Sequence, residues 1–178
     1  MKMLGIPGSI RPNSYNKAFL VWVGKLLKPM GVELEVVEIN EMPIPLGARE
    51  TVPEIVAKFK KKVKDADAVI FSTPQYNYSF PESLRSTIDW VAFPSDDNCW
   101  SGRKGFIMGV SRDTAGVIKA EVKLKEYMRV LGMEVFDGES IAVERAGEIL
   151  DEEGGLLDKK IELKTKKVLE EFVQWVKK

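Results

Sequence analysis

The sequence predicts an α/β protein in which helices cover both faces of a parallel sheet. Strand-like and helix-like segments alternate along the chain, five of each, which is typical of a doubly wound sheet with right-handed crossovers. The uninterrupted apolar run at 67–74 indicates a strand that is buried on both faces. A length of 178 residues suits one domain, so we expect residues 1–178 to form a single domain.

Two kinds of pattern predict the elements of the first half. Strands are short apolar runs, whereas helices show apolar residues three and four positions apart. Pro29-Met30-Gly31 ends the first helix, and Pro53 opens the second. The expected elements are, in order, a strand at 2–8, a helix from 14, a strand at 32–39, a loop with two prolines at 41–47, a helix from 53 to about 65 and the strand at 67–74.

The second half continues the alternation. Pro81 opens a helix in which Leu84, Ile88 and Val91 share one face. After it we expect a polar loop at 94–102, a strand at 104–110, a polar turn at 111–116, a helix to about 131, a weak strand at 133–136 with 140–143 as a candidate continuation, a charged loop at 151–155 and a last helix spanning 156–175. Five strands in such a unit favour the order 2-1-3-4-5.

Composition excludes several classes of function. The 27 basic and 27 acidic residues balance, so no footprint for nucleic acid or an anionic membrane is expected. No apolar run is long enough to span a bilayer. The N-terminal residues read as a strand and not as a signal peptide, so a cytoplasmic location is expected.

The chain has no histidine and one cysteine, which restricts its chemistry. Histidine-based triads and most transition-metal sites are excluded, as are an internal disulfide and a cysteine-ligated cluster. Redox or transfer chemistry must then depend on a bound cofactor, on carboxylates or on tyrosines. Cys99 lies in an acidic loop and is expected to have no catalytic role.

The remaining charged residues read as solvated surface. Asp96 and Asp97 are adjacent in a loop, and two lysine runs lie on predicted helices. The lysines expected on exposed faces are Lys58, Lys60, Lys61, Lys62, Lys64, Lys164, Lys166 and Lys167.

Three polar loops follow the first, third and fourth strands. They are GSIRPNSYN (8–16), the loop around PQYNYSFP (74–81) and SRDTAG (111–116). In the order 2-1-3-4-5 the carboxyl ends of these strands are neighbours, and ligands of such sheets bind at that edge. We therefore expect one ligand site built from the three loops.

The loop at 8–16 is suited to a phosphate. Asn13 or Ser14 can cap the following helix, whose first N–H groups attract anions, and Arg11 adds a charged fork. The alternative is a helix cap beside a solvated arginine. Neither a Walker A motif nor GxGxxG is present, so sites for ATP and for a Rossmann-type dinucleotide are not supported.

The loop at 74–81 is suited to a flat heterocycle. The N–H groups of Gln75, Tyr76 and Asn77 can face the edge of a ring, and Tyr76, Tyr78 and Phe80 offer aromatic faces. The alternative is a surface loop with core aromatics. Ser79 or Phe80 is expected to cap the next helix, with Pro81 as its first residue.

Two of these stretches resemble the motifs of a known family. GSIRPNSYN is similar to the GS-[IL]-R-x-x-S-x-N loop of the NADPH-dependent FMN reductases, which include quinone, chromate and azo-dye reductases. PQYNYSFPESLRSTIDW resembles their P-E-Y-N-x-S-x-P-x-x-L-K-N-A-I-D-W signature. The resemblance covers essentially the whole chain and implies a flavodoxin-like three-layer sandwich that binds FMN.

The resemblance also implies roles for individual residues. The residues that would hold the 5′-phosphate are Ser9, Arg11, Ser14 and Asn16, with Tyr15 as a neighbour. Those that would hold the ring are Pro74, Gln75, Tyr76, Asn77, Tyr78 and Ser79, with Ser111 closing its other side. The substrate face would be shaped by Tyr76, Tyr78 and Arg112. Departures from the family pattern are Gln75 in place of Glu, Glu82 in place of Gly, Arg85 in place of Lys, and a fourth loop without its usual glycines.

The expected function is that of an FMN-dependent NAD(P)H oxidoreductase. NADPH or NADH would reduce the flavin, and a small acceptor such as a quinone or a free flavin would reoxidise it, with no catalytic residue required from the protein. A flavodoxin-like electron carrier and an FMN-binding redox sensor are the alternatives. The family also implies a homodimer or homotetramer, and aromatic residues around Trp90, Phe93 and Trp100 are candidates for the subunit contact.

Overall fold

A parallel sheet forms the centre of the molecule. The computed structural model describes residues 1–44, 51–112, 114, 116–150 and 156–178. The strands follow the order β2-β1-β3-β4-β5, with β6 also paired to β4, so the predicted order 2-1-3-4-5 is confirmed. The strands are β1 (Lys2–Pro7), β2 (Glu33–Val36), β3 (Ala68–Thr73), β4 (Lys104–Val110), β5 (Glu134–Val135) and β6 (Ala142–Val143).

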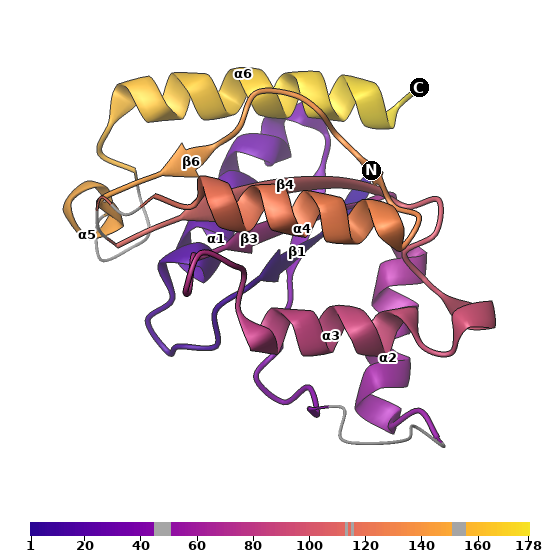
Figure 1. Ribbon diagram of the computed structural model, residues 1–178. Coiled ribbons are helices and arrows are strands. Elements are labelled where there is room, and N and C mark those ends of the chain that lie inside the picture. Colours follow the sequence, from indigo (N-terminus) through magenta and orange to yellow (C-terminus); the bar gives the residue numbers. More distant parts are fainter. Residues whose placement is uncertain (45–50, 113, 115, 151–155) are drawn as a thin grey trace.

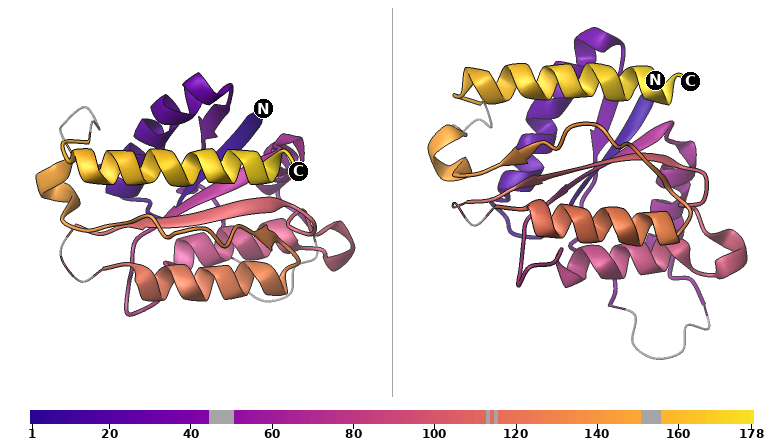
Figure 2. Two further views of the ribbon diagram at one scale, coloured as in Figure 1. Left: turned by 90° about the horizontal axis from the view of Figure 1, so that it is seen from above. Right: turned by 45° about the horizontal axis from the view of Figure 1, so that its top comes forward.

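Helices cover both faces of this sheet, as Figures 1 and 2 show. One face carries α1 (Tyr15–Leu27) and α6 (Lys159–Val176), whose apolar residues pack together in one core cluster. The other carries α2 (Glu54–Asp65), α3 (Glu82–Ala92) and α4 (Ile118–Val130), which share a second cluster. The shorter helices are α5 (Ala146–Ile149) and the 3₁₀ helices η1 (Lys28–Met30) and η2 (Ser95–Asp97).

β3 lies at the centre because it is apolar on both faces. All six of its residues are buried. Val69 and Phe71 belong to the cluster under α2, α3 and α4, whereas Ala68 and Ile70 belong to the cluster under α1 and α6, as the two-residue alternation of a strand requires. The interpretation of 67–74 as a doubly buried strand is thus confirmed.

The fifth strand is interrupted. β5 pairs with Lys104 and Gly105 at the start of β4, and β6 pairs with Gly109 and Val110 at its end. The expected strand at 133–136 and its continuation at 140–143 therefore both lie along β4. The helix expected at 156–175 begins later, at Lys159, because the Asp158 carboxylate accepts hydrogen bonds from Lys160 N and Ile161 N. The four-residue helix α5 was not predicted, and the loop at 151–155 and the end of the loop at 41–47 lie outside the described residues.

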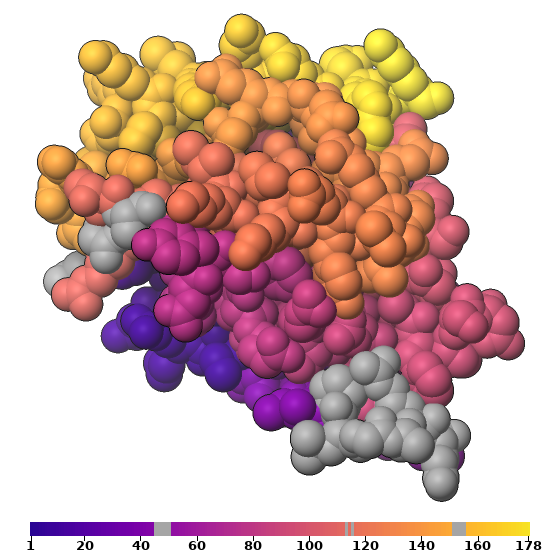
Figure 3. Space-filling view, viewed as in Figure 1, coloured from indigo at the N-terminus to yellow at the C-terminus, as the bar shows by residue number. Residues whose placement is uncertain are grey.

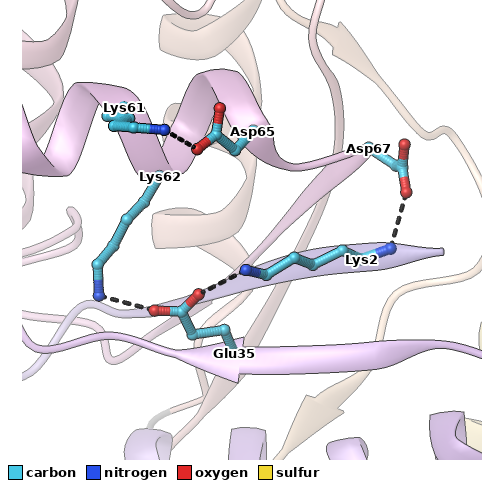
Figure 4. A network of polar contacts seen from close by, with 6 residues as sticks. All are labelled: Lys2, Glu35, Lys61, Lys62, Asp65 and Asp67. Carbon is cyan, nitrogen blue, oxygen red and sulfur yellow. Dashed lines mark hydrogen bonds and ion pairs between the residues drawn. The ribbon is translucent and has the colours of Figure 1, made fainter.

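Ion pairs join β2 to β1 and to α2, and a hydrogen bond joins β1 to the residue before β3 (Figure 4). Glu35 accepts from Lys62 at 2.7 Å and pairs with Lys2 at 3.4 Å, and the Lys62 hydrogen bond is the main cause of its lowered pKa. The Asp67 carboxylate accepts from the backbone N–H of Lys2 at 2.7 Å. Exposed pairs of this kind contribute about 1 kcal/mol or less.

Lys60 does not lie on an exposed face, so that prediction is wrong. Its side chain is 4% exposed; its ammonium donates to the Phe93 carbonyl at 2.6 Å and pairs with Asp97 at 2.8 Å. Asp97 is correspondingly not a freely solvated carboxylate: hydrogen bonds from Lys60 and Lys64 lower its pKa to about 2. Cys99 is buried, and burial raises the pKa of its thiol, which agrees with the expected lack of a catalytic role.

Two further expectations are wrong. Trp90 and Trp100 are buried and donate their indole N–H groups to Pro43 O and Ile88 O, so both belong to the core of one chain; Phe93 is half-buried, and its part in a subunit contact stays a prediction. Pro81 itself is the N-cap of α3, without a side-chain capping bond, so neither Ser79 nor Phe80 caps this helix. Within the described residues, no helix is long and apolar enough to cross a membrane.

Candidate functional site

The polar loops after β1, β3 and β4 lie at one edge of the sheet. Figure 3 shows the indigo, magenta and orange-red segments meeting at the left side of the molecule. The backbone N–H of Gly8 donates to Ser72 O at 2.7 Å. A side chain at Gly8 would meet Leu84, Thr73 and Pro74 atoms at 3.1–3.3 Å. Glycine therefore lets the start of the first loop lie close to the end of β3 and to the ring of Pro74, the first residue of the third loop.

In the first loop, Ser14 is the N-cap of α1, as predicted. Its hydroxyl oxygen accepts from Lys17 N at 3.3 Å. Ser9 Oγ accepts from the backbone N–H of Arg11 at 3.4 Å, and the Arg11 side chain is exposed. The loop thus presents a hydroxyl, a guanidinium and the N-terminus of a 13-residue helix on the same edge.

A cavity of about 260 Å³ adjoins this loop. The first loop and α1 contribute Ser9, Arg11 and Lys17 to its lining, and the segment after β2 contributes Glu38 and Asn40. Lys17 and Glu38 form an ion pair. Lys17, Glu38 and Asn40 were not identified from the sequence, although Lys17 directly follows the motif, Glu38 lies near the end of the second predicted strand and Asn40 directly follows it. Cationic and hydroxyl groups around a hollow of this size fit a phosphate.

Asn16 faces inward and differs from its neighbours in this loop. It is 3% exposed; its Nδ2 donates to Val110 O at 3.1 Å, and its Oδ1 accepts from Val110 N at 3.2 Å and from Ser72 Oγ at 2.8 Å. These bonds join α1 to β3 and β4. The amide is thus mainly a structural tie, and its contact with a phosphate stays a prediction.

Tyr15 is half-buried on α1. Its hydroxyl lies against α5, 3.2 Å from the position that a Cβ would take at Gly147. The phenol therefore packs against α5, and its place beside the phosphate stays a prediction.

The third loop contains a tight two-residue turn. Tyr76 N donates to Ser79 O at 2.8 Å, and Ser79 N donates to Tyr76 O at 2.9 Å. Asn77 and Tyr78 both have left-handed backbones, with φ of 49° and 61°, which fits a type I′ turn. The Tyr76 N–H is engaged within the turn, so the expectation that it faces a ligand is wrong. A left-handed tyrosine costs roughly 1–2 kcal/mol, and such strain is often found at functional sites.

The two tyrosines of this turn contact cations on different elements. The guanidinium carbon of Arg11 is 5.7 Å from the centroid of the Tyr76 ring. The Lys119 ammonium, in the first turn of α4, is 4.3 Å from the centroid of the Tyr78 ring. Both rings remain accessible, with 41% of Tyr76 and 63% of Tyr78 exposed. Lys119 was not identified from the sequence because only the fold places it beside Tyr78.

Helix α4 also packs against the third loop. Gln75 Oε1 accepts from Ala120 N at 3.3 Å, which caps a helix whose own N-cap, Val117, offers no side-chain bond. The Phe80 ring lies 5.8 Å from that of Tyr127, and the Tyr127 hydroxyl hydrogen-bonds Asp89. Arg85 lies over the Tyr127 ring at 4.6 Å. The third loop is therefore held on α4 at two places, by the hydrogen bond of Gln75 and by the packing of Phe80 on Tyr127.

The fourth loop is held at its start. Ser111 N donates to Val143 O at 2.8 Å, and Ser111 O accepts from Ala146 N at 3.0 Å. Arg112 follows with an exposed side chain. Residues 113 and 115 of SRDTAG lie outside the described part of the chain. Ser111 and Arg112 thus belong to the same edge as the other two loops, on the side nearest α4 and β6.

The groups at this edge are suited to binding more than to acid–base or metal chemistry. In the described part of the chain, no group of three or more cysteine and carboxylate side chains could hold a metal ion. Among the described carboxyl groups, Glu121, in the first turn of α4, is the one with a raised pKa. It is 2% exposed and hydrogen-bonds Ser140, and burial raises its pKa to about 7.

Comparisons with known proteins agree on one family. A model described as NADPH-dependent FMN reductase matches residues 1–148. The chain is 31% identical to an NAD(P)H-dependent FMN reductase of Pseudomonas aeruginosa, over all of this chain and 96% of the other. It is 29% identical to a quinone reductase of Pseudomonas putida, over 97% and 92%.

Solved structures give the same result for the fold. The flavoenzyme FerB of Paracoccus denitrificans, an NAD(P)H:acceptor oxidoreductase, superposes with a TM-score of 0.88 at 25% identity, over 99% of this chain and 97% of FerB. An archaeal flavodoxin superposes with a TM-score of 0.66 at 16% identity, covering both chains fully. At that identity the flavodoxin shows only a shared fold.

Proposed function

The chain belongs to the NADPH-dependent FMN reductase family, and from this premise we propose that the loops at 8–16 and 74–81 hold one FMN at the carboxyl edge of the sheet. The protein is an FMN-dependent NAD(P)H oxidoreductase. The observation that carries the site assignment is the contact between Arg11 and the Tyr76 ring. It brings a phosphate-binding side chain and the aromatic loop together.

The residues at this edge fit the two ends of FMN. Ser9, Arg11 and the capped N-terminus of α1 would bind the phosphate beside the 260 Å³ cavity. Residues 74–79 would lie along the ring, with Gln75 fixed by Ala120 N. Ser111 would close the other side, since its backbone is held by β6 and α5. Asn16 would act indirectly, by fixing the start of α1.

When bound, FMN supplies the redox chemistry, accepting a hydride from the reduced nicotinamide and passing electrons to the acceptor. The protein binds and orients the reactants. Tyr76, Tyr78 and Arg112 are proposed to shape the face on which donor and acceptor bind in turn. Because no described side chain is needed as a proton donor, the lack of histidine is compatible with this role.

A quinone is the proposed acceptor class, since quinone reductases are among the relatives of similar length. We also propose a single domain that assembles as a homodimer or homotetramer in the cytoplasm and binds no nucleic acid. Exposed Ile118 and Val122 on α4 support a subunit contact. Light scattering tests the assembly, and a monomer would contradict it.

The test of the function is an absorbance spectrum of the FMN-loaded protein, followed by NADPH or NADH without oxygen and then by a quinone. Bleaching by the nicotinamide and recovery with the quinone are expected. Protein that binds no FMN, or bound FMN that neither nicotinamide bleaches, would contradict the proposal. Accumulation of one-electron-reduced flavin without steady turnover would instead favour an electron carrier.

A further inference from the structure

We propose that Lys119, with the Tyr78 ring, binds a phosphate-bearing part of the nicotinamide donor. This inference rests on the proposed function and concerns the same edge of the sheet. It assigns to Lys119 a role in donor binding, separate from the groups that hold FMN.

The geometry separates two cationic positions. Arg11 contacts Tyr76 from the first loop, whereas Lys119 contacts Tyr78 from the first turn of α4. The left-handed turn at Asn77 and Tyr78 lies between them. Arg112 is exposed on the loop that leads into α4. The turn therefore has Arg11 on its phosphate-loop side and Lys119 on its α4 side.

The lysines near the first loop and at the start of α4 differ in their pairing. Lys17, beside the first loop, is paired with Glu38. Lys119 forms no ion pair with a carboxylate of the described residues, and Glu121, two residues later on α4, is buried against Ser140. Among the described residues, Glu144 has its carboxylate beside this loop, with its Oε1 3.0 Å from the position of a Cβ at Gly116. The Lys119 ammonium is thus available to an anionic ligand.

The chemistry of the donor matches this arrangement. FMN has one phosphate, which the first loop accounts for. A reduced nicotinamide dinucleotide has two bridging phosphates, and NADPH has a third on its adenosine ribose. If the nicotinamide lies over the flavin ring, the phosphates of the donor must extend outward over the loops around the ring. An ammonium is a strong point charge for phosphate, and the exposed face of Tyr78 can stack against adenine. A neutral quinone has carbonyl oxygens but no anionic group to pair with Lys119.

The experiment compares Lys119→Ala and Lys119→Arg with Lys166→Ala, which removes an exposed lysine from α6 on the opposite face. Steady-state rates are measured at varied NADPH with a neutral quinone, and calorimetry measures binding of NADP⁺ and of adenosine 2′,5′-bisphosphate. For Lys119→Ala we expect about a tenfold rise in the KM for NADPH and in both dissociation constants, the size of one lost charge-assisted hydrogen bond. kcat, the quinone KM and FMN affinity should not change, and Lys119→Arg should restore most of the binding.

Other outcomes overturn the inference. An unchanged KM for NADPH would show that Lys119 does not touch the donor, and a rise only in the quinone KM would assign it to the acceptor. A parallel loss of FMN affinity would assign it to the flavin. If the wild-type protein bound no FMN, the proposed function would fall. Binding of adenosine 2′,5′-bisphosphate to the wild type and to Lys119→Ala would still decide the present inference.

Discussion

Arg11 and Tyr76 contact each other across the two loops that flank the sheet's reversal of strand order, with the guanidinium carbon 5.7 Å from the ring centroid. The two residues are 65 positions apart in sequence. They meet because β1 and β3 are parallel neighbours with their carboxyl ends at the same edge. The account of the site follows from this contact: one loop binds the phosphate of FMN and the other binds its ring.

Arg11→Ala tests the proposed phosphate-binding part of the FMN site. Loss of the guanidinium should weaken FMN binding about tenfold or more, as expected for one charge-assisted hydrogen bond. Binding of riboflavin, which lacks the phosphate, should not change. Adding Ser14→Ala should weaken FMN binding further while leaving the fold intact. Fluorescence titration measures both affinities, and Arg129→Ala, at an exposed arginine paired with Asp137, is the matched control. Equal losses for FMN and riboflavin would move the phosphate elsewhere.

Asn16→Ala tests the structural tie between α1 and the sheet. Removing the amide leaves buried partners on Val110 and Ser72 unsatisfied, so we expect a loss of about 2–3 kcal/mol in the free energy of unfolding. Ser14→Ala, which removes only a helix cap, should cost about 1 kcal/mol. Urea denaturation of the FMN-free protein measures both. A normal unfolding curve for Asn16→Ala, combined with a loss specific to FMN over riboflavin, would instead make Asn16 a direct phosphate ligand.

Gln75 tests the support of the ring loop by α4. Gln75→Leu keeps the side-chain size but removes the acceptor for Ala120 N, so FMN and riboflavin should both bind several-fold more weakly. Gln75→Glu should retain binding, because a carboxylate accepts the same bond and is favoured at a helix N-terminus. The two affinities are measured as for Arg11. An unchanged Gln75→Leu protein would show that the loop holds its shape without α4.

Glu121 tests the effect of a buried carboxyl group on stability. Burial raises its folded-state pKa from 4.5 to about 7, so the folded protein holds this proton more tightly than the unfolded chain. Its contribution to the free energy of unfolding should therefore fall as pH rises from about 4.5 to 7. Glu121→Gln should remove this dependence. Its free energy of unfolding relative to the wild type should therefore be higher at pH 8 than at pH 5, by up to about 3 kcal/mol. Urea denaturation of both proteins at both pH values measures these free energies. The same difference between the two proteins at pH 5 and at pH 8 would contradict the shifted pKa.

The sequence alone was sufficient to predict the strand order and the edge of the sheet at which the three polar loops lie. Both depend on the alternation of strands and helices and on the handedness of crossovers, which are local or general rules. Ser14 could be identified as a cap for the same reason, since capping involves only its own helix. The family resemblance then identified FMN as the expected ligand.

Contacts between distant segments could not be predicted in this way. Asn16 turns inward because Val110 and Ser72, far along the chain, offer it buried partners. Lys60 is buried because Asp97 and the Phe93 carbonyl meet it from another loop. Its helical spacing from Val56 and Val63 does place Lys60 on the buried face of α2, but the groups that pair with its charge could not be predicted. Lys119 was missed for the same reason, since its partner Tyr78 lies on a separate loop.

A crystal structure of the FMN-loaded protein tests the central claim most directly. The account predicts a single FMN with its phosphate within hydrogen-bonding distance of Ser9, Arg11 and Ser14, and with its ring along residues 74–79. A phosphate bound away from the first loop, or a ring that does not contact residues 74–79, would contradict it.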